Sequence, residues 1–149
     1  MEDEESVVTE EVRARVGKET EPREFVLGSE SVMQIVAAAG EDPAPFAAEG
    51  AEVPLYAALA LDRGQPSLEL PILMPASLLN SNEWEFFRPP RVGERLVVRG
   101  KIGEVRERFG GQFGHSVIVR FEYDFRTPDG ELVARSARAL TEYDPKGGR

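Results

Sequence analysis

The sequence predicts an α+β fold, with one strand and two helices followed by four antiparallel strands. Residues 115–126 alternate between apolar and polar side chains, which is typical of an antiparallel strand with one face in water. Residues 29–39 carry apolar side chains at the i, i+3, i+4 and i+7 spacing of a helix with one buried stripe, namely Val32, Ile35, Val36 and Ala39. Because a one-faced sheet must cover its apolar side, we expect the helices to pack against it.

The folded domain is predicted to span residues 23–144. Residues 1–22 are expected to form an acidic tail and a short helix, with the helix at 9–16. Residues 24–28 carry apolar side chains at alternate positions, which suits a short first strand. The polar, glycine-rich residues 145–149 are expected to form a C-terminal tail.

Two helices are predicted between the first strand and the rest of the sheet. Ser29 is expected to cap the first helix at its N-terminus, and Gly40 is a natural terminator. The second helix is predicted to be short and buried, at 54–61, with a proline in its first turn, where the missing N–H costs nothing. The segments 41–52 and 63–76 are rich in proline and glycine and are predicted to be loops.

The second half of the chain is predicted to be almost entirely strand, at 82–88, 94–105, 115–126 and 131–143. Pro89 and Pro90 end the first of these strands. The glycine-rich segment 106–114 suits a flexible hairpin connection between the second and the third. Residues 127–130, Thr-Pro-Asp-Gly, are a strong turn signal before the last strand.

Composition narrows the functional classes. The chain has 149 residues, the size of one domain, with a formal net charge of −9 and no cysteine. The lack of cysteine excludes disulfides, zinc–cysteine sites and thiol nucleophiles, and we expect neither a metal nor a cofactor. The negative charge makes double-stranded nucleic acid a poor partner. Because the N-terminus is acidic and no apolar run approaches the roughly 20 residues of a membrane span, we expect a cytoplasmic protein with no signal peptide and no membrane partner.

Three segments of the chain resemble motifs of a known family. Residues 80–96 read N-S-N-E-W-E-F-F-R-P-P-R-V-G-E-R-L and resemble the F-x-x-P-[VL]-x-x-G-D-x-L strand and turn of the MaoC-like dehydratase superfamily. The closest similarity is to the N-terminal, dehydratase-like half of the superfamily, which often carries W-x-F-x-R-P. Residues 127–135, T-P-D-G-E-L-V-A-R, resemble its N-x-x-G-E-x-V turn, and residues 39–43, A-G-E-D-P, resemble A-x-A-x-G-D-x-N-P. The order and spacing of these segments carry the resemblance, which spans residues 25–143.

The resemblance implies a hot-dog fold, in which a curved antiparallel sheet wraps around a central helix, here residues 54–61. It also implies that two such domains pair, as a homodimer or as a heterodimer with a catalytic MaoC-like chain, and form acyl-thioester sites at their interface. The family's reaction is the reversible hydration of trans-2-enoyl thioesters of coenzyme A or acyl carrier protein. That chemistry requires an acid/base pair to activate water and to move a proton at Cα.

The family's acid/base pair belongs to a D-x-N-P-x-H motif, whose Asp and His hold the water. Aligned without gaps, this sequence places Glu41 on the Asp. Pro43 then stands on the Asn and Phe46 on the His, and phenylalanine cannot transfer a proton. A one-residue gap restores Asp42-Pro43 in place of Asn-Pro but still provides no histidine. Glu41 and Asp42 are therefore the candidate catalytic residues of a degraded pair, although adjacent carboxylates in a turn are also typical of solvated residues.

Four residues are candidates for substrate binding: Phe46, Tyr56, Trp84 and Arg88. The aromatic residues would line an acyl channel, but aromatic side chains in strands and helices are more often core. Arg88 would present charge to a coenzyme A phosphate, and the same two interpretations, phosphate contact or solvated strand face, apply to Arg91, Lys101, Arg106 and Arg108. His115, the only histidine, is far in sequence from residues 41–46, the hydratase-like loop. A lone polar residue on a strand usually faces water.

Three functions are compatible with these residues. The leading hypothesis is a non-catalytic or accessory subunit of an enoyl-thioester hydratase or 3-hydroxyacyl-thioester dehydratase, which shapes the acyl pocket for a catalytic MaoC-like partner. The second is a stand-alone acyl-CoA hydratase or thioesterase that uses Glu41 or Asp42; Asp62 lies at the wrong end of the central helix to assist. The third is a hot-dog protein that binds acyl-CoA without turnover or serves only as a scaffold.

Overall fold

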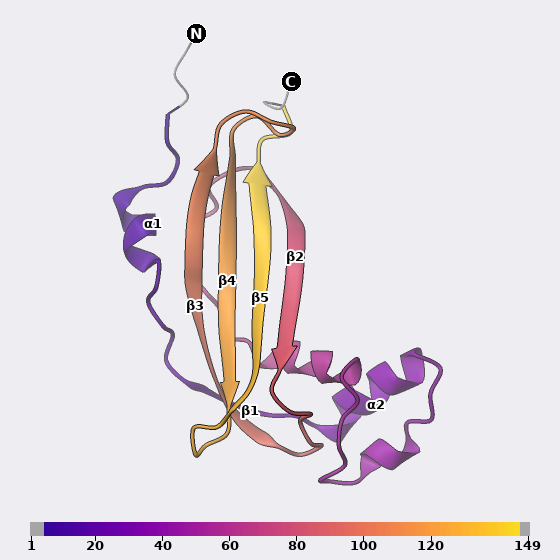
Figure 1. The fold of residues 1–149 in the computed structure, drawn as a ribbon. Helices are drawn as coiled ribbons and strands as arrows, with labels where there is room; N and C mark the ends of the chain where they lie inside the picture. The colour runs from indigo at the N-terminus through magenta and orange to yellow at the C-terminus, as the bar shows by residue number, and fades with distance from the viewer. Residues whose placement is uncertain (1–4, 147–149) are drawn as a thin grey trace.

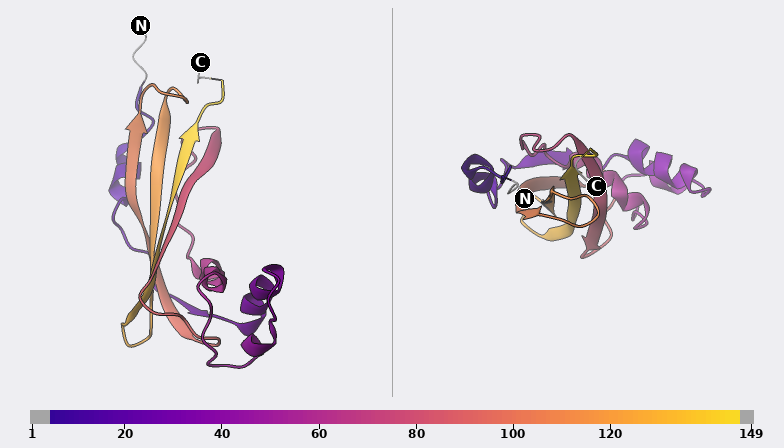
Figure 2. Two further views of the ribbon diagram at one scale, coloured as in Figure 1. Left: turned by 45° about the vertical axis from the view of Figure 1, so that its right-hand side comes forward. Right: turned by 90° about the horizontal axis from the view of Figure 1, so that it is seen from above.

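The computed structural model describes residues 5–146 and contains one five-stranded antiparallel sheet in the order β1-β3-β4-β5-β2 (Figure 1). The strands are β1 Arg23–Val26, β2 Ala76–Phe86, β3 Arg95–Arg108, β4 Ser116–Arg126 and β5 Leu132–Tyr143. Seen from above, the sheet is strongly curved (Figure 2). All five predicted strands are confirmed, but β2 begins at Ala76 rather than Asn82 and β3 runs to Arg108. The sheet therefore has two edges, the short β1 and the long β2.

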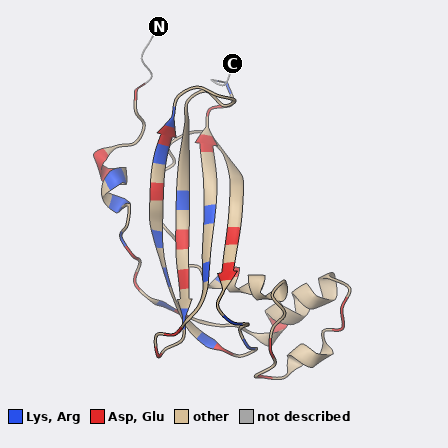
Figure 3. Cartoon of the chain, viewed as in Figure 1, with Lys and Arg blue, Asp and Glu red and all other residues tan. Residues whose placement is uncertain are grey.

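Alternation along the strands separates an inner apolar face from an outer charged face. On β4, the inner residues are almost fully buried: Val117, Val119, Phe121, Tyr123 and Phe125. Acidic and basic residues alternate along the other face of the same strands (Figure 3). The upper half of β2 carries no charge on either face. The alternation predicted for residues 115–126 therefore shows which face of the sheet is buried and which faces water.

Three helical segments after β1 gather at one end of the sheet (Figures 1 and 2). They are α2 Ser29–Ala38, the short 3-10 helix η1 Ala44–Ala47 and the longer 3-10 helix η2 Ala57–Gly64. The second predicted helix is present, but it is a 3-10 helix that begins at Ala57 and extends past Leu61. Gly64 lies against the ring of Phe25, where a Cβ would come within 2.7 Å of the ring carbon Cγ. This close approach holds η2 against β1.

The predicted cap of α2 is wrong in one detail. Gly28 occupies the N-cap position with extended backbone, and no side chain caps the helix. Ser29 is already the first helical residue, so its hydroxyl is not placed to accept from the next turn. Gly40 ends the helix as predicted, with φ +82°. The buried stripe is narrower than predicted, because Val32 and Val36 are buried whereas Ile35 is half-buried and Ala39 is exposed. Ile35 still packs against the core from its edge.

The residues before β1 belong to the same core. The predicted short helix is confirmed as α1 Glu10–Arg15, capped by Thr9, whose Oγ1 accepts from the amide of Val12. Val12 is only 1% exposed. Beyond α1, the amides of Gly17 and Thr20 donate to carbonyls of β3 at 2.8 Å. Among residues 5–146, no helix is long and apolar enough to span a membrane.

Truncation of Val12 tests whether α1 is part of the cooperative fold. Val12→Ala removes two buried methyl groups and is expected to lower the free energy of unfolding by about 2 kcal/mol. Val26→Ala is the control, because Val26 is half-exposed on an edge strand, and its effect should stay within about 0.5 kcal/mol. Urea denaturation followed by circular dichroism measures both. An unchanged stability in Val12→Ala would mean that α1 docks independently of the domain.

Candidate functional site

The hydratase-like loop follows α2 and leads into η1. Glu41 and Asp42 are both exposed. Oδ1 of Asp42 accepts from the backbone amide of Ala44 at 3.0 Å, which closes the turn that starts η1. Phe46, predicted to stand in place of the family's histidine, is half-buried and packs against the core. The loop therefore presents two carboxylates and no proton-transferring partner among its own residues.

His115 lies at the other end of the sheet. The connection between β3 and β4, which carries His115, is at the top of Figure 1, whereas α2 and η1 lie beyond the bottom of the sheet. Nε2 of His115 donates to Oε2 of Glu107 at 2.7 Å, and the imidazole stacks on the ring of Phe109 with 4.6 Å between centroids. The structure therefore does not bring His115 together with Glu41 or Asp42.

Glu107 joins the N-terminal segment to the sheet. Besides His115, it accepts from the hydroxyl of Ser6 and from the amide of Val7 at 3.2 Å. Its side chain is only 11% exposed. Burial alone would raise the pKa of the Glu107 carboxyl, but the hydrogen bonds from Ser6, His115 and the backbone outweigh it and lower that pKa. This cluster was not predicted, because the sequence pattern ended the strand before Glu107.

Two of the predicted aromatic residues lie in different surroundings. The ring of Trp84 is stacked on Phe86, with 5.7 Å between centroids, and is tilted against Phe125 at 5.4 Å. Tyr56 precedes η2 and is 42% exposed, next to Leu55, which is 52% exposed, and close in sequence to Leu59, which is 44% exposed. Trp84 is thus a member of the core on the inner face of β2, and Tyr56 contributes to an apolar surface on the helical end of the molecule.

Arg88 is held by two carboxylates. Its guanidinium contacts Glu94 at 2.5 Å through Nη2 and Glu131 at 3.0 Å through Nε. The hydrogen bond to Glu94 is the main cause of a raised pKa of Arg88. The pKa of Glu94 is lowered, because the hydrogen bonds from Arg88 and from the amide of Arg91 outweigh the effect of burial. Arg88 therefore ties the end of β2 to the start of β3 and to the turn before β5, and its contact with substrate stays a prediction.

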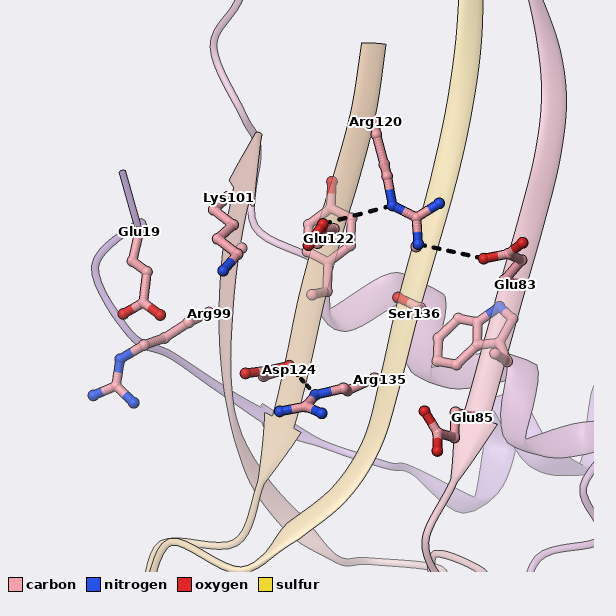
Figure 4. A pocket seen from close by; sticks show the side chains of 14 residues that line it. Glu19, Glu83, Glu85, Arg99, Lys101, Arg120, Glu122, Asp124, Arg135 and Ser136 are labelled. Atoms are coloured by element: carbon pink, nitrogen blue, oxygen red, sulfur yellow. Dashed lines mark hydrogen bonds and ion pairs between the residues drawn. The ribbon is translucent and has the colours of Figure 1, made fainter. Parts of the chain in front are cut away.

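A shallow hollow of about 330 Å³ lies on the outer face of the sheet (Figure 4). Acids and bases from neighbouring strands alternate across it. Arg135 pairs with Asp124 at 3.1 Å, and Arg120 pairs with Glu83 at 3.4 Å. These ion pairs make part of the hollow a salt-bridged sheet surface, remote from the hydratase-like loop.

The inner face holds a cation that the sequence analysis did not single out. Arg138 lies on β5 opposite Phe121 and Asn82, in the phase that points to the core. Its guanidinium carbon lies 5.3 Å from the ring centroid of Phe121 and 5.9 Å from that of Tyr123. The signal available in the sequence was a charged residue in the inward phase of the predicted strand 131–143.

Comparisons with known proteins identify the fold. No protein-family model and no curated protein matches the sequence. Among solved structures, the C-terminally truncated HadBC (3R-hydroxyacyl-ACP dehydratase) complex of Mycobacterium tuberculosis aligns with TM-score 0.60 and 23% identity, over 85% of this chain and 96% of that chain. The ChsH1–ChsH2 complex of the same organism aligns with TM-score 0.66 and 15% identity, over 88% and 87%. The R-hydratase PhaJ1 of Pseudomonas aeruginosa aligns with TM-score 0.51 and 14% identity, over 87% and 82%. The predicted hot-dog fold is confirmed.

The Glu107 cluster makes a prediction about acid stability. A carboxyl whose pKa is lowered by folding stabilises the protein above its unfolded pKa of about 4.3, and that contribution is lost as the pH falls through the folded value. Glu107→Gln should therefore be less stable than the unmodified protein near pH 7, and the difference should shrink below about pH 4. The free energy of unfolding in urea, measured across this range, gives the difference.

Glu104→Gln is the matched control on the same strand. Glu104 is exposed, and its ion pair with Arg106 is long, at 4.0 Å. It should change stability little at any pH. A pH-independent difference between Glu107→Gln and the unmodified protein would contradict the assignment of Glu107 as an ionised anchor.

Proposed function

We propose that this chain is an accessory subunit of an enoyl-thioester hydratase or 3-hydroxyacyl-thioester dehydratase and shapes the acyl pocket for a catalytic MaoC-like partner. One observation carries the proposal: the hydratase-like loop lacks an acid/base pair. Its two carboxylates, Glu41 and Asp42, are exposed. The histidine of the chain is bound to Glu107 at the opposite end of the sheet. General acid–base catalysis needs both groups within hydrogen-bond reach of the same water or substrate.

The edge strand β2 supports the presence of a partner. From Ala76 to Asn82 this strand carries no charge and no proline, two of the features by which edge strands avoid pairing with another chain. Its one irregularity is the register shift between Leu79 and Ser81 in its pairing with β5. Leu79 is 59% exposed on β2, and the nearby Ile72 is 86% exposed. An uncharged edge with exposed apolar residues is suited to the addition of a strand from a second subunit.

Two of the structural neighbours lend further support. HadBC is a complex with the activity of a 3R-hydroxyacyl-ACP dehydratase, and ChsH1–ChsH2 is also a complex. Both share the fold of this chain over most of its length. By this likeness we infer a heteromer in which the partner supplies the Asp/His pair and the substrate is an acyl thioester of coenzyme A or acyl carrier protein.

Reconstitution tests the accessory role. The purified chain is mixed with a MaoC-like chain of the same organism that carries D-x-N-P-x-H, and hydration of crotonyl-CoA and of a longer enoyl-CoA is followed by loss of the conjugated-thioester absorbance. We expect the mixture to exceed the partner alone by about tenfold or more in kcat/KM, most clearly on the longer substrate. Loss of the partner's histidine should abolish this rate.

The carboxylates of this chain provide the matched control. Glu41→Gln and Asp42→Asn should leave the rate of the mixture unchanged, because the partner performs the proton transfers. If either variant abolished turnover, the chain would be a hydratase or thioesterase in its own right. If the chain bound acyl-CoA but neither formed a complex nor altered the rate, it would be a binding protein.

A charge on the β2 edge tests the pairing surface. Leu79→Lys places an ammonium group on the exposed edge and is expected to weaken subunit association by about tenfold or more. Val26→Lys, at the half-exposed position on the opposite edge strand β1, is the control and should leave association unchanged. Sedimentation velocity across a concentration series measures both. Equal association of the two variants would exclude β2 as the pairing edge.

A further inference from the structure

Arg138 is a cation on the inner face of the sheet. Among residues 5–146, no carboxylate lies within ion-pair distance of it. Its one side-chain hydrogen bond is long, 3.4 Å from Nη2 to the hydroxyl of Tyr123. Two aromatic faces, Phe121 and Tyr123, lie over the guanidinium. Charged groups removed from water are normally paired with an opposite charge, so this arrangement is unusual for a purely structural residue.

Two buried donors on this face have no acceptor. Nε of Arg138 and Nε1 of Trp84 are buried and make no hydrogen bond within the described part of the chain. Arg138 is opposite Asn82 in the β2–β5 register, and Trp84 is opposite Ser136, so the two donors come from diagonal positions on adjacent strands. Because buried side-chain donors nearly always have a partner, two unpaired donors on adjacent strands indicate an acceptor outside the described part of the chain.

The described neighbours provide no acceptor for these two donors, and the positive charge of Arg138 favours an anion. The hydroxyl of Ser136 accepts from Nε2 of Gln65 at 3.0 Å and forms no hydrogen bond with Nε of Arg138 or Nε1 of Trp84. Asp62 is close enough for its charge to act on Tyr123, but it forms no ion pair with Arg138. Asn82, the neighbour of Arg138 on the edge strand, is exposed, so the site lies one strand in from the open edge of the sheet.

We propose that Arg138 and Trp84 bind a carboxylate group on the inner face of β5 and β2. An arginine and an indole N–H together offer two donors to the two oxygens of a carboxylate, and the aromatic faces hold the guanidinium in place. If the proposed function holds, this carboxylate belongs either to the far end of an acyl thioester that bears a second acid group or to a side chain of the partner subunit.

Tryptophan fluorescence measures this site directly, because Trp84 is the only tryptophan in the chain. The full-length protein is titrated with sodium propionate and, separately, with propionamide, a neutral molecule of nearly the same shape, at constant ionic strength. We expect a saturable change of emission with propionate at millimolar concentration and none with propionamide. Equal responses to the two, or none to either, would overturn the proposal whether or not any variant folds.

Two arginine variants locate the response. Arg138→Gln should remove the response to propionate. Arg135→Gln should keep it, since Arg135 is on the same strand but on the outer face, paired with Asp124. A response that persists in Arg138→Gln would overturn the role of Arg138. Circular dichroism of both variants confirms that they are folded before titration.

A matched pair of thioesters distinguishes the source of the carboxylate. Glutaconyl-CoA differs from crotonyl-CoA by one terminal carboxylate. Binding of glutaconyl-CoA that is tighter by about tenfold or more, and that becomes equal in Arg138→Gln, assigns the group to the substrate. Equal binding of the two thioesters, with an intact response to propionate, assigns it to the partner subunit. Neither titration depends on turnover, so a failure here is distinct from a failure of the reconstitution assay.

Discussion

Burial of the inner face of four long strands is the constraint on which the rest of this molecule depends. Strands β2 to β5 are 11 to 14 residues long, whereas the longest helical segment has 10. The helices cover one end of the sheet, and other segments must cover the remainder. The N-terminal segment with Val8 and Val12 contributes to this, as do the partly buried apolar residues of the loop before β2, namely Leu68, Leu70, Leu73 and Met74. Several separate parts of the chain therefore cover the inner face of the sheet.

This length also separates the groups that could do chemistry. The carboxylates of the hydratase-like loop lie with the helices at one end of the sheet, and His115 lies at the hairpin end. Asp42 and His115 each have a structural role in their own region. Asp42 closes a turn, and His115 binds Glu107, which holds the N-terminal segment to the sheet. Polar groups that the fold does not use, the donors of Arg138 and Trp84, lie instead on the inner face near the open edge. This arrangement is the basis of the proposal that the chain is an accessory subunit and that another chain performs the proton transfer.

Much of the fold was predictable from local patterns, and the differences have physical causes. The alternation in 115–126 predicted β4 and the orientation of the sheet, because side-chain period is a local property. The start of β2 was missed, since the polar residues near Asn80 offer no alternation there and the strand is defined only by pairing with β5. The Ser29 cap was wrong because Gly28 takes the extended backbone that an N-cap needs. The pairing of Glu107 with His115 and Ser6 arises from tertiary structure, which a linear pattern does not encode.

If residues 5–146 form no hydratase acid/base pair, as proposed, the chain alone should not hydrate crotonyl-CoA, and this is the most direct test. With protein in excess over substrate, loss of the conjugated-thioester absorbance is followed in a single turnover, so that even slow chemistry is detected. The account predicts a rate equal to that of the uncatalysed reaction in buffer. A faster loss that disappears in Glu41→Gln or Asp42→Asn would contradict it and would identify this chain as a catalyst.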